Sequence, residues 1–162
     1  MGRKERIAAS PDLGVLAGRL LFAVQSELFT RLHDLGFDDL KPRHGAVLAY
    51  MEVGGVRATE LAQRSGQHKQ VIGTLVDELT ALGYVKRQTD PADRRAKLVC
   101  PTARGRAQME AADQIMAEML SRHEKRLGKH VFEDFQRTFM DVVEHQRRAV
   151  RSDPGAGSGR FR

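Results

Sequence analysis

The stretch TELAQRSGQHKQVIGTLVDELTALG, residues 59–83, decides the fold of this 162-residue chain. It predicts a short helix over 59–65, for which Thr59 is the expected N-cap. A turn at Gly66 leads into a second helix over 68–82, whose apolar residues recur at three- and four-residue steps. Two short helices joined by a glycine turn are typical of a helix-turn-helix.

A basic hairpin is expected after this helix pair. Strand signals over 84–89 and 97–100 flank the segment DPADRRA, residues 90–96, in which Asp-Pro favours a turn. The basic residues at or beside the expected tip are Arg94, Arg95 and Lys97. Such side chains can follow phosphates or enter a DNA minor groove. A solvated turn with a local Asp–Arg pair is the alternative, and the preceding helix pair disfavours it.

The outward face of the 68–82 helix has the chemistry of a major-groove surface. Its residues are small, polar or basic, namely His68, Lys69, Gln70, Gly73 and Thr74. Gly73 would weaken a helix by ~1 kcal/mol relative to alanine, but it would also allow a close approach to DNA. An ordinary pair of packed helices is the alternative interpretation of 59–82.

Longer helices are expected on both sides of this region. Leucines recur at helical spacing over 12–35 behind Asp12, a plausible N-cap, and 42–52 predicts a shorter helix that starts at Pro42. Thr102 is expected to cap a long helix over 103–127, with apolar residues along one face. A last helix is expected over 130–150, and the stretch 152–162 has the Gly/Ser/Pro-rich composition of a disordered tail.

Charge is distributed unevenly along the chain. The net charge is +6 and the pI is about 9.9. Residues 57–106 carry a net charge of +5 and residues 147–162 a net charge of +4, whereas residues 107–146 carry −3. This asymmetry is expected where a DNA-facing module joins a segment with another role, and solvated charge is the alternative.

Three blocks carry a resemblance to a known family. They are TELAQRSG (59–66), LVDELTALGYVKR (75–87) and DPADRRAKLVCPTARG (90–105). Their order and spacing resemble MarR-type winged-helix transcription regulators, the multiple-antibiotic-resistance regulator family. With the flanking helices the resemblance covers residues 12–150. It implies an obligate homodimer built from the first and the last two helices, with 68–82 as recognition helix and 84–100 as wing.

The resemblance implies a fold class and a domain organisation. The class is mainly α (α+β), a winged helix-turn-helix domain with a small β-hairpin wing and a helical dimerisation domain formed by the N- and C-terminal helices. The expected regions are 12–35 and 103–150 for dimerisation, 40–100 for DNA binding, and 152–162 for the tail.

Roles in DNA binding are carried over by position. Contacts with bases or phosphates are implied for His68, Lys69, Gln70 and Thr74. Arg95 is implied as the minor-groove arginine and Arg94 as a phosphate contact. Asp77 and Asp93 are expected to orient wing arginines, because a carboxylate beside a phosphate is repelled. His68 stands where the family often has a small N-cap such as serine, which leaves the base preference open.

The resemblance also implies a small-molecule effector, because the family commonly binds small anionic or aromatic molecules between the dimer helices and the winged domain. Arginine and histidine suit a carboxylate or a phenolate. The candidates in this chain are Arg19, Arg31, His33, Arg43, His44 and Tyr50. The alternative for Arg43 and His44 is a solvated or capping role in the first turn of a helix. The Met-rich stripe over 109–120 suits a pliable pocket, a core or a dimer interface.

Several chemistries are excluded or disfavoured. Cys100 is the single cysteine, so a disulfide within the chain and a cysteine-based zinc framework are excluded, and a buried strand cysteine is expected rather than a redox switch. The six histidines form no helical metal-binding pair. A site from His33 and His44 with Asp34 or Asp38 stays open, but we expect no metal and no cofactor. No nucleophile lies beside an oriented base, so an enzyme is not expected.

Membrane attachment is not expected either. No apolar run approaches the ~20 residues that span a bilayer, and the N-terminal residues lack the apolar core of a secretory signal. We therefore expect a cytoplasmic protein.

The helix pair and basic hairpin together with the family resemblance imply a homodimeric repressor that binds a pseudo-palindromic operator in double-stranded DNA. A small anionic or phenolic effector would release it. The alternative is a non-sensing architectural or partner-binding protein with the same winged domain, and sequence-selective binding that a small molecule releases distinguishes the two.

Overall fold

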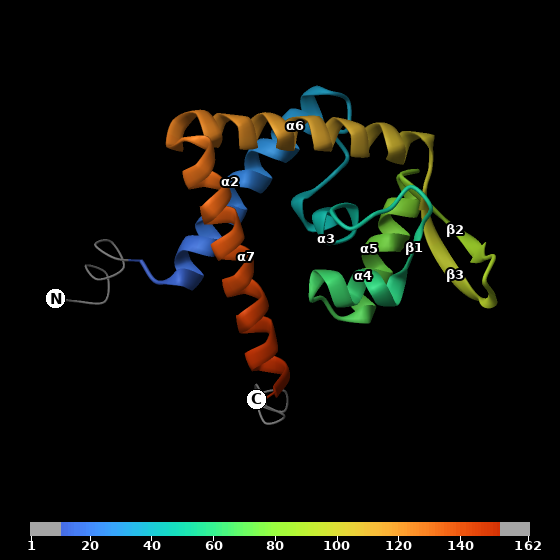
Figure 1. Ribbon diagram of the computed structural model, residues 1–162. Helices are drawn as coiled ribbons and strands as arrows, with labels where there is room; N and C mark the ends of the chain where they lie inside the picture. Colours follow the sequence, from blue (N-terminus) through green and yellow to red (C-terminus); the bar gives the residue numbers. More distant parts are fainter. Residues whose placement is uncertain (1–10, 153–162) are drawn as a thin grey trace, which may run out of the picture. The chain divides into compact units, whose positions relative to one another are not determined.

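The structure is a computed structural model that describes residues 11–152 (Figure 1). It divides into two compact units, Met1–Met116 and Ala117–Arg162. In chain order the elements are α2 (Leu13–Asp34), the 3₁₀ turn η1 (Pro42–His44), α3 (Gly45–Leu48), β1 (Val56–Arg57), α4 (Ala58–Ser65), α5 (Lys69–Ala81), β2 (Val85–Asp90), β3 (Asp93–Pro101), α6 (Ala103–Leu127) and α7 (Lys129–Ser152). Long helices with one small antiparallel sheet confirm the expected fold class, mainly α (α+β).

Helix α2 begins where the sequence predicts. The Asp12 carboxylate accepts a hydrogen bond of 2.9 Å from the backbone N–H of Val15, which satisfies one of the free donors at the helix start. The helix ends at Asp34. Only Phe29 and Leu32 are buried within it, so its first three turns expose most of their leucines.

The helix expected over 42–52 is much shorter in the structure. It consists of the η1 turn and the four residues of α3, and it ends at Leu48. The chain must leave the helical path here because it turns at Gly55 into β1. A Cβ on Gly55, whose φ is +89°, would lie 2.5 Å from the Cys100 Sγ atom of β3. The close approach of β1 to β3 therefore ends the helix early.

The expected N-cap of the first short helix is also wrong. Arg57 is the N-cap of α4, without a side-chain cap hydrogen bond, and Thr59 lies inside the first turn. Strand β1 pairs antiparallel with β3 through Val56 opposite Val99 and Arg57 opposite Leu98. Because Arg57 is held in the sheet, the helix begins directly after it.

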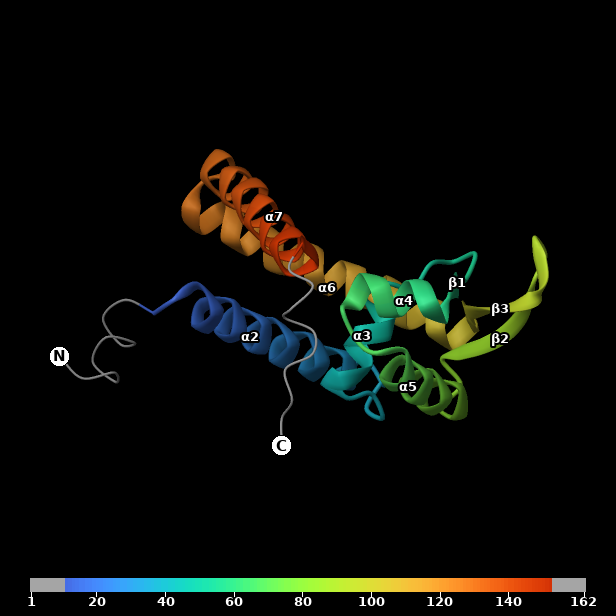
Figure 2. The same cartoon turned by 90° about the horizontal axis from the view of Figure 1, so that it is seen from below.

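The hairpin is tighter than the sequence predicts. The sheet has the order β1-β3-β2, and Asp90 pairs with Asp93, so only Pro91 and Ala92 lie between the two strands. The Asp90 carboxylate accepts a hydrogen bond of 2.8 Å from the N–H of Ala92, a local bond that favours the turn. Arg94 and Arg95 therefore belong to β3. The β2–β3 hairpin extends away from α4 and α5 in two views (Figures 1 and 2).

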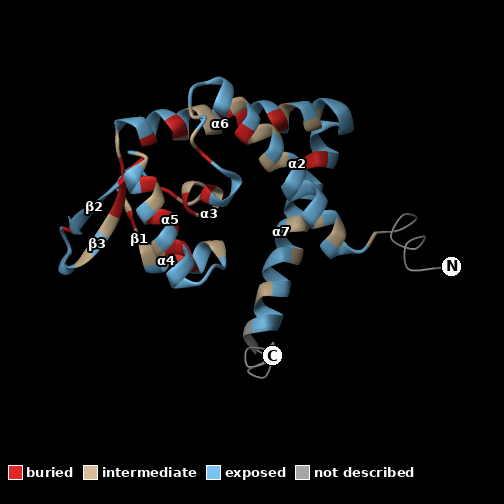
Figure 3. Ribbon diagram, turned by 180° about the vertical axis from the view of Figure 1, so that it is seen from behind, coloured by how far each residue is buried: buried red, intermediate tan, exposed pale blue. Residues whose placement is uncertain are grey.

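The core of the first unit lies where α4, α5 and the base of the sheet meet. Its fully buried side chains include Leu61 of α4 and Ile72, Val76 and Leu79 of α5. Most residues toward the hairpin tip are exposed, apart from buried Asp90, as Figure 3 shows. Burial of aliphatic side chains is the main stabilising contribution here, at roughly 1.5–3 kcal/mol for each. The core thus fixes α5 by one face and leaves its other face exposed.

Helix α6 begins as predicted behind Thr102. The Thr102 Oγ1 atom accepts a hydrogen bond of 3.1 Å from the N–H of Gly105 and donates to the Gly83 carbonyl at 2.6 Å. A Cβ on Gly105 would lie 2.1 Å from the Tyr84 carbonyl oxygen, so the first turn of α6 needs glycine at this position. These contacts join α6 to the end of α5.

The second unit contains the end of α6 and the whole of α7, close to the expected 130–150. The rings of Phe132, Phe135 and Phe139 stack along α7 with centroid separations of 6.2 and 5.7 Å. Phe132 is buried and also lies 5.6 Å from the ring of His123 in α6. Ser152 is the last residue of α7, and the rest of the expected 152–162 tail lies outside the described residues.

One expectation about apolar length needs correction. Helix α2 has 22 residues, and an 18-residue window within it has a mean hydropathy of 1.3, so it is long and apolar enough to cross a membrane. The helix is not one unbroken apolar run, because Arg19, Gln25, Ser26 and Glu27 interrupt its apolar residues, yet the mean over the window is still apolar. The same composition suits a helix that packs against another helix.

Candidate nucleic-acid interface and cavity

The outward face of α5 carries the residues that the sequence singled out. His68 is the N-cap of α5 and makes no side-chain cap hydrogen bond. The side chains of His68, Lys69, Gln70 and Thr74 are exposed, and Gly73 is half-buried. A Cβ added to Gly73 would meet nothing within 4 Å, so no packing contact in the described chain requires glycine there. This face is therefore free for an outside partner.

The wing carries two arginines without partners. Arg94 and Arg95 are exposed on β3, and their guanidinium groups have no hydrogen-bond or ion-pair partner among residues 11–152. The third wing cation is different, because Lys97 Nζ donates to Thr89 Oγ1 at 2.8 Å across the hairpin. Unpaired cations on a projecting hairpin are suited to bind phosphates.

Two acidic residues were expected to orient wing arginines. Asp77 of α5 does so with Arg87 of β2, at 2.7 Å between Oδ1 and Nη2. Asp93 accepts the backbone N–H of Arg95 at 3.1 Å, and its carboxylate lies 3.8 Å from Arg57. Asp93 thus holds the strand backbone and faces a β1 arginine, rather than a wing guanidinium.

A brace at the wing was not foreseen. Arg57 of β1 donates two hydrogen bonds to Asp90 Oδ2, at 2.9 Å from Nε and 2.5 Å from Nη2. These hydrogen bonds, followed by the one from the Ala92 N–H, hold the pKa of Asp90 below its ordinary value. The sequence signal for this brace is Arg57, a charged residue that directly follows the apolar Val56 in the short strand β1.

A second polar cluster fixes the far end of α5. Buried His44 contacts Glu78 of α5 at 2.9 Å through Nε2 and accepts the Lys41 N–H at 3.1 Å through Nδ1. Arg43 Nε donates to the same Glu78 oxygen at 3.0 Å. The hydrogen bond with His44 is the main cause that lowers the pKa of Glu78, and Arg43 adds to it. The cluster joins η1 to the recognition-helix candidate.

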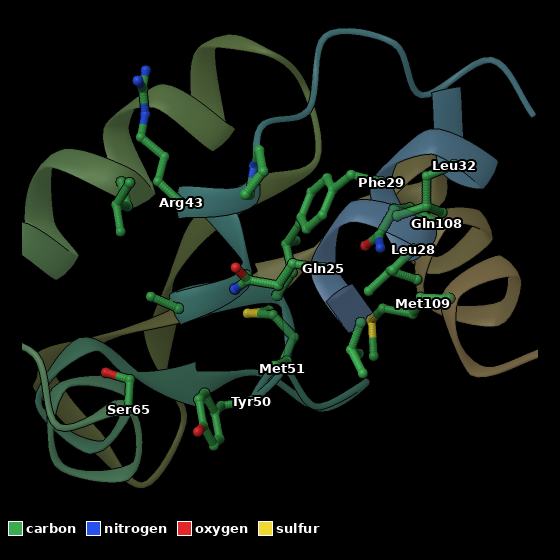
Figure 4. A pocket seen from close by; sticks show the side chains of 18 of the residues that line it. Gln25, Leu28, Phe29, Leu32, Arg43, Tyr50, Met51, Ser65, Gln108 and Met109 are labelled. Carbon is green, nitrogen blue, oxygen red and sulfur yellow. The ribbon is translucent and has the colours of Figure 1, made fainter. Parts of the chain in front are cut away.

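A cavity of about 770 Å³ lies within the first unit (Figure 4). Its walls come from α2, the η1–α3 segment, the α4–α5 turn and α6, and most of the lining side chains are aliphatic, aromatic or methionine. The polar lining residues are Gln25, Arg43, Tyr50, Ser65, Gln67, Gln108 and Asp113. A volume in this range, with few polar groups, is typical of small-molecule sites.

The cavity includes two of the six residues expected to bind an effector. Arg43 and Tyr50 line it, whereas Arg19, Arg31, His33 and His44 do not. His33 Nε2 instead lies 2.8 Å from the Leu40 carbonyl oxygen. Arg31 lies 3.9 Å from Glu27 on the same helix.

Gln108 of α6 was missed by sequence reasoning. It is 3% exposed, and its Oε1 atom has no hydrogen-bond partner among the described residues. The signal was present, because Gln108 shares a helix face with Ala112 and Ile115, four and seven residues further on. A glutamine on an apolar face needs a partner for its amide.

The alternative zinc site is not supported. Within residues 11–152 no group of three or more His, Cys, Asp or Glu side chains is placed to hold a metal ion. His33 and His44 instead contact Leu40 and Glu78. Cys100 is buried at the base of β3, as expected.

The helix pair, the sheet and the hairpin define a winged-helix protein. Residues 38–96 match the model of the MarR family. This region of the chain is therefore similar to transcription regulators of that family, and solved structures of such regulators are similar to the chain.

Three relatives illustrate the similarity. The chain is 40% identical to the uncharacterized HTH-type transcriptional regulator YcgE of Bacillus subtilis (strain 168) over an aligned stretch of 50 residues. This stretch covers 31% of this chain and 32% of YcgE. CouR from Rhodococcus jostii RHA1, in its crystal structure bound to p-coumaroyl-CoA, is 29% identical with a TM-score of 0.67, over 82% of this chain and 92% of that chain. A MarR-family regulator from Rhodococcus sp. RHA1 is 27% identical with a TM-score of 0.65, over 82% and 94%. The chain thus matches about a third of the length of YcgE.

Proposed function

We propose that this protein is a homodimeric transcription regulator, in the simplest case a repressor, that binds a pseudo-palindromic operator and is released by a small molecule. The observation that carries the proposal is an exposed polar face on α5 beside a hairpin with two unpaired arginines in the same winged-helix unit. An apolar core fixes α5, so this face can be presented to DNA without rearrangement.

In this proposal α5 is the recognition helix. Lys69, Gln70 and Thr74 lie in its first two turns, where a recognition helix contacts base edges. Gln70 can form a bidentate contact with adenine, and Lys69 can contact guanine or a phosphate. Arg95 enters the minor groove and Arg94 contacts a phosphate. Lys97 is tied to Thr89 and adds positive charge to the wing.

Dimerisation is proposed from the apolar surface of the terminal helices. On α7 the exposed apolar residues are Val131, Phe135, Met140, Val143 and Val150, and on α2 they are Leu13, Leu16, Leu20, Leu21 and Phe22. Phe22 is 75% exposed, which is costly for a soluble monomer. A second copy would cover these side chains and present two α5 helices to half-sites about one DNA turn apart.

Effector release is proposed from the cavity. The anionic or phenolic ligand expected for the family would occupy the space of about 770 Å³. Arg43 both lines this space and bonds to Glu78 of α5, so a ligand that moves Arg43 also acts on the recognition helix. The similar protein CouR was crystallised with p-coumaroyl-CoA, which supports a ligand-responsive role. Such a regulator would act in the cytoplasm.

The test is selection of the purified protein on a random duplex DNA pool, read by sequencing. Enrichment of a pseudo-palindrome of roughly 16–20 base pairs is expected for a symmetric dimer. Retention of DNA without an enriched motif, and with steep salt dependence, would favour the architectural alternative. No retention at low salt by ligand-free, refolded protein would contradict DNA binding.

A further inference from the structure

The cavity in the first unit contains a buried polar group that the protein leaves unsatisfied. Gln108 lines the cavity and is 3% exposed, and its Oε1 atom has no partner among residues 11–152. Figure 4 shows the Gln108 amide turned inward from α6, toward the side where Leu28 and Phe29 of α2 lie. A buried acceptor without a partner is costly, so a group that donates to it is strongly favoured.

The charges of the cavity argue against an anion at this position. Among residues 11–152, Arg43 is the one cationic residue in the lining, and it already donates to Glu78 of α5. In Figure 4 its guanidinium is directed away from Gln25 and Met51. The other charged lining residue is Asp113, which would repel a carboxylate. An acceptor oxygen such as Gln108 Oε1 also repels a carboxylate rather than binding it.

The remaining walls set the body of the ligand. Leu28, Phe29, Met51 and Met109 give an apolar and partly flexible surface. The volume of about 770 Å³ exceeds what one ring needs, so a bicyclic or longer molecule fits.

We propose that Gln108 is a specificity-determining residue that selects an uncharged ligand with an apolar body and a hydroxyl or N–H group, which donates to Gln108 Oε1. This inference rests on the proposed ligand-responsive function and makes it more specific. The family resemblance implied an anionic or a phenolic effector. Of these two, this inference favours the uncharged phenolic ligand over the carboxylate.

Three probes of the same shape test it, namely 2-naphthol, naphthalene and 2-naphthoate. At pH 7 the first is a neutral donor, the second has no polar group and the third is an anion. The chain has no tryptophan, so naphthyl fluorescence reports binding without that background. Wild-type protein is expected to bind 2-naphthol about three- to tenfold more tightly than naphthalene, and 2-naphthoate most weakly of the three.

Gln108→Leu removes the acceptor and nearly preserves the side-chain volume. The variant is expected to lose the preference for 2-naphthol and to bind naphthalene at least as well as wild type. Its ligand-free melting temperature should rise by about 2–4 °C, because an unsatisfied buried group is gone. Gln114→Leu makes the same change at an exposed site of α6 outside the cavity lining, and it should keep the preference.

The results separate this inference from the proposed function. A Gln108→Leu variant that keeps the preference for 2-naphthol overturns the role of Gln108. Tightest binding of 2-naphthoate, or no binding of any probe to wild type, overturns the neutral-donor specificity. Binding of 2-naphthol that leaves the affinity for the selected operator unchanged supports the site but contradicts effector release. Failure to bind duplex DNA contradicts the proposed function and leaves the probe result standing.

Discussion

At the scale of single residues, the two unpaired arginines of β3 give the most direct test of the DNA interface. Arg95→Ala should weaken binding about tenfold across many DNA sequences, because a phosphate or minor-groove contact carries little sequence information. The slope of log K against log salt concentration should become shallower by about 1. Fluorescence anisotropy with operator and scrambled duplexes over a salt series measures both quantities.

A matched control for this prediction exists on α7. Arg137→Ala removes an exposed arginine that pairs with Asp134 in the second unit, and it should leave the affinity and the salt slope unchanged. Equal effects of the two substitutions would mean that bulk charge, rather than the wing, sets the affinity. No effect of Arg95→Ala would remove the wing from the interface.

The Arg57–Asp90 brace predicts a dependence of stability on acid. Asp90 has a pKa below its ordinary value of 3.8, because the ionised carboxylate accepts the Arg57 hydrogen bonds. A group with a depressed pKa in the folded state stabilises the protein above the unfolded-state pKa, and this contribution is lost as pH falls through the folded-state pKa. The free energy of unfolding from urea titrations should therefore drop below about pH 4. Asp90→Asn should make that drop smaller, and an unchanged profile would contradict the brace.

At the scale of elements, α5 contains a glycine that its packing does not need. Gly73→Ala should raise the free energy of unfolding by about 0.5–1 kcal/mol, because alanine is a better helix former and the added Cβ meets nothing within 4 Å. The same methyl group should lower operator affinity about tenfold if this face lies against DNA.

Gly18→Ala on α2 is the matched control for this substitution. A Cβ there also meets nothing within 4 Å, so the stability should rise by a similar amount, and this substitution controls for the helix-propensity effect alone. Urea denaturation and anisotropy measured on both variants separate the two effects. Undiminished affinity of Gly73→Ala would show that this face of α5 does not approach DNA closely.

The shortest elements are where sequence reasoning was least accurate. The long helices α2, α6 and α7 have the predicted bounds to within a few residues, since apolar periodicity over several turns is a strong signal. In place of the helix expected over 42–52 the structure has only η1 and α3, and the N-cap of α4 is Arg57 rather than Thr59. Both differences arise from the pairing of β1 with β3, a contact between residues more than 40 positions apart.

At the scale of the whole molecule, the exposed apolar face of α7 predicts the assembly state. Val143→Glu should weaken the homodimer about a hundredfold or more, because a buried dimer interface would have to accept an unpaired carboxylate. Sedimentation equilibrium measures the dimer dissociation constant, and operator binding should fall in parallel.

The control adds the same carboxylate to the opposite side of α7. His145 lies two residues further along the helix, so its side chain is turned about 200° away from that of Val143, and it is exposed. His145→Glu should therefore remain dimeric. A Val143→Glu protein that stays dimeric at low micromolar concentration would contradict the proposed interface.

The sequence alone determined the order of helices and strands, the outward chemistry of α5 and the positive charge of the wing. These properties depend on residues close together in the chain, where helical periodicity, glycine turns and local charge act directly. Only the tertiary structure decided which side chains are already occupied. It pairs Arg43 and His44 with Glu78, joins Arg57 to Asp90, and leaves the Oε1 atom of Gln108 without a hydrogen-bond partner among the described residues. Those outcomes follow from contacts across 30 or more residues, and periodicity along one helix contains no information about them.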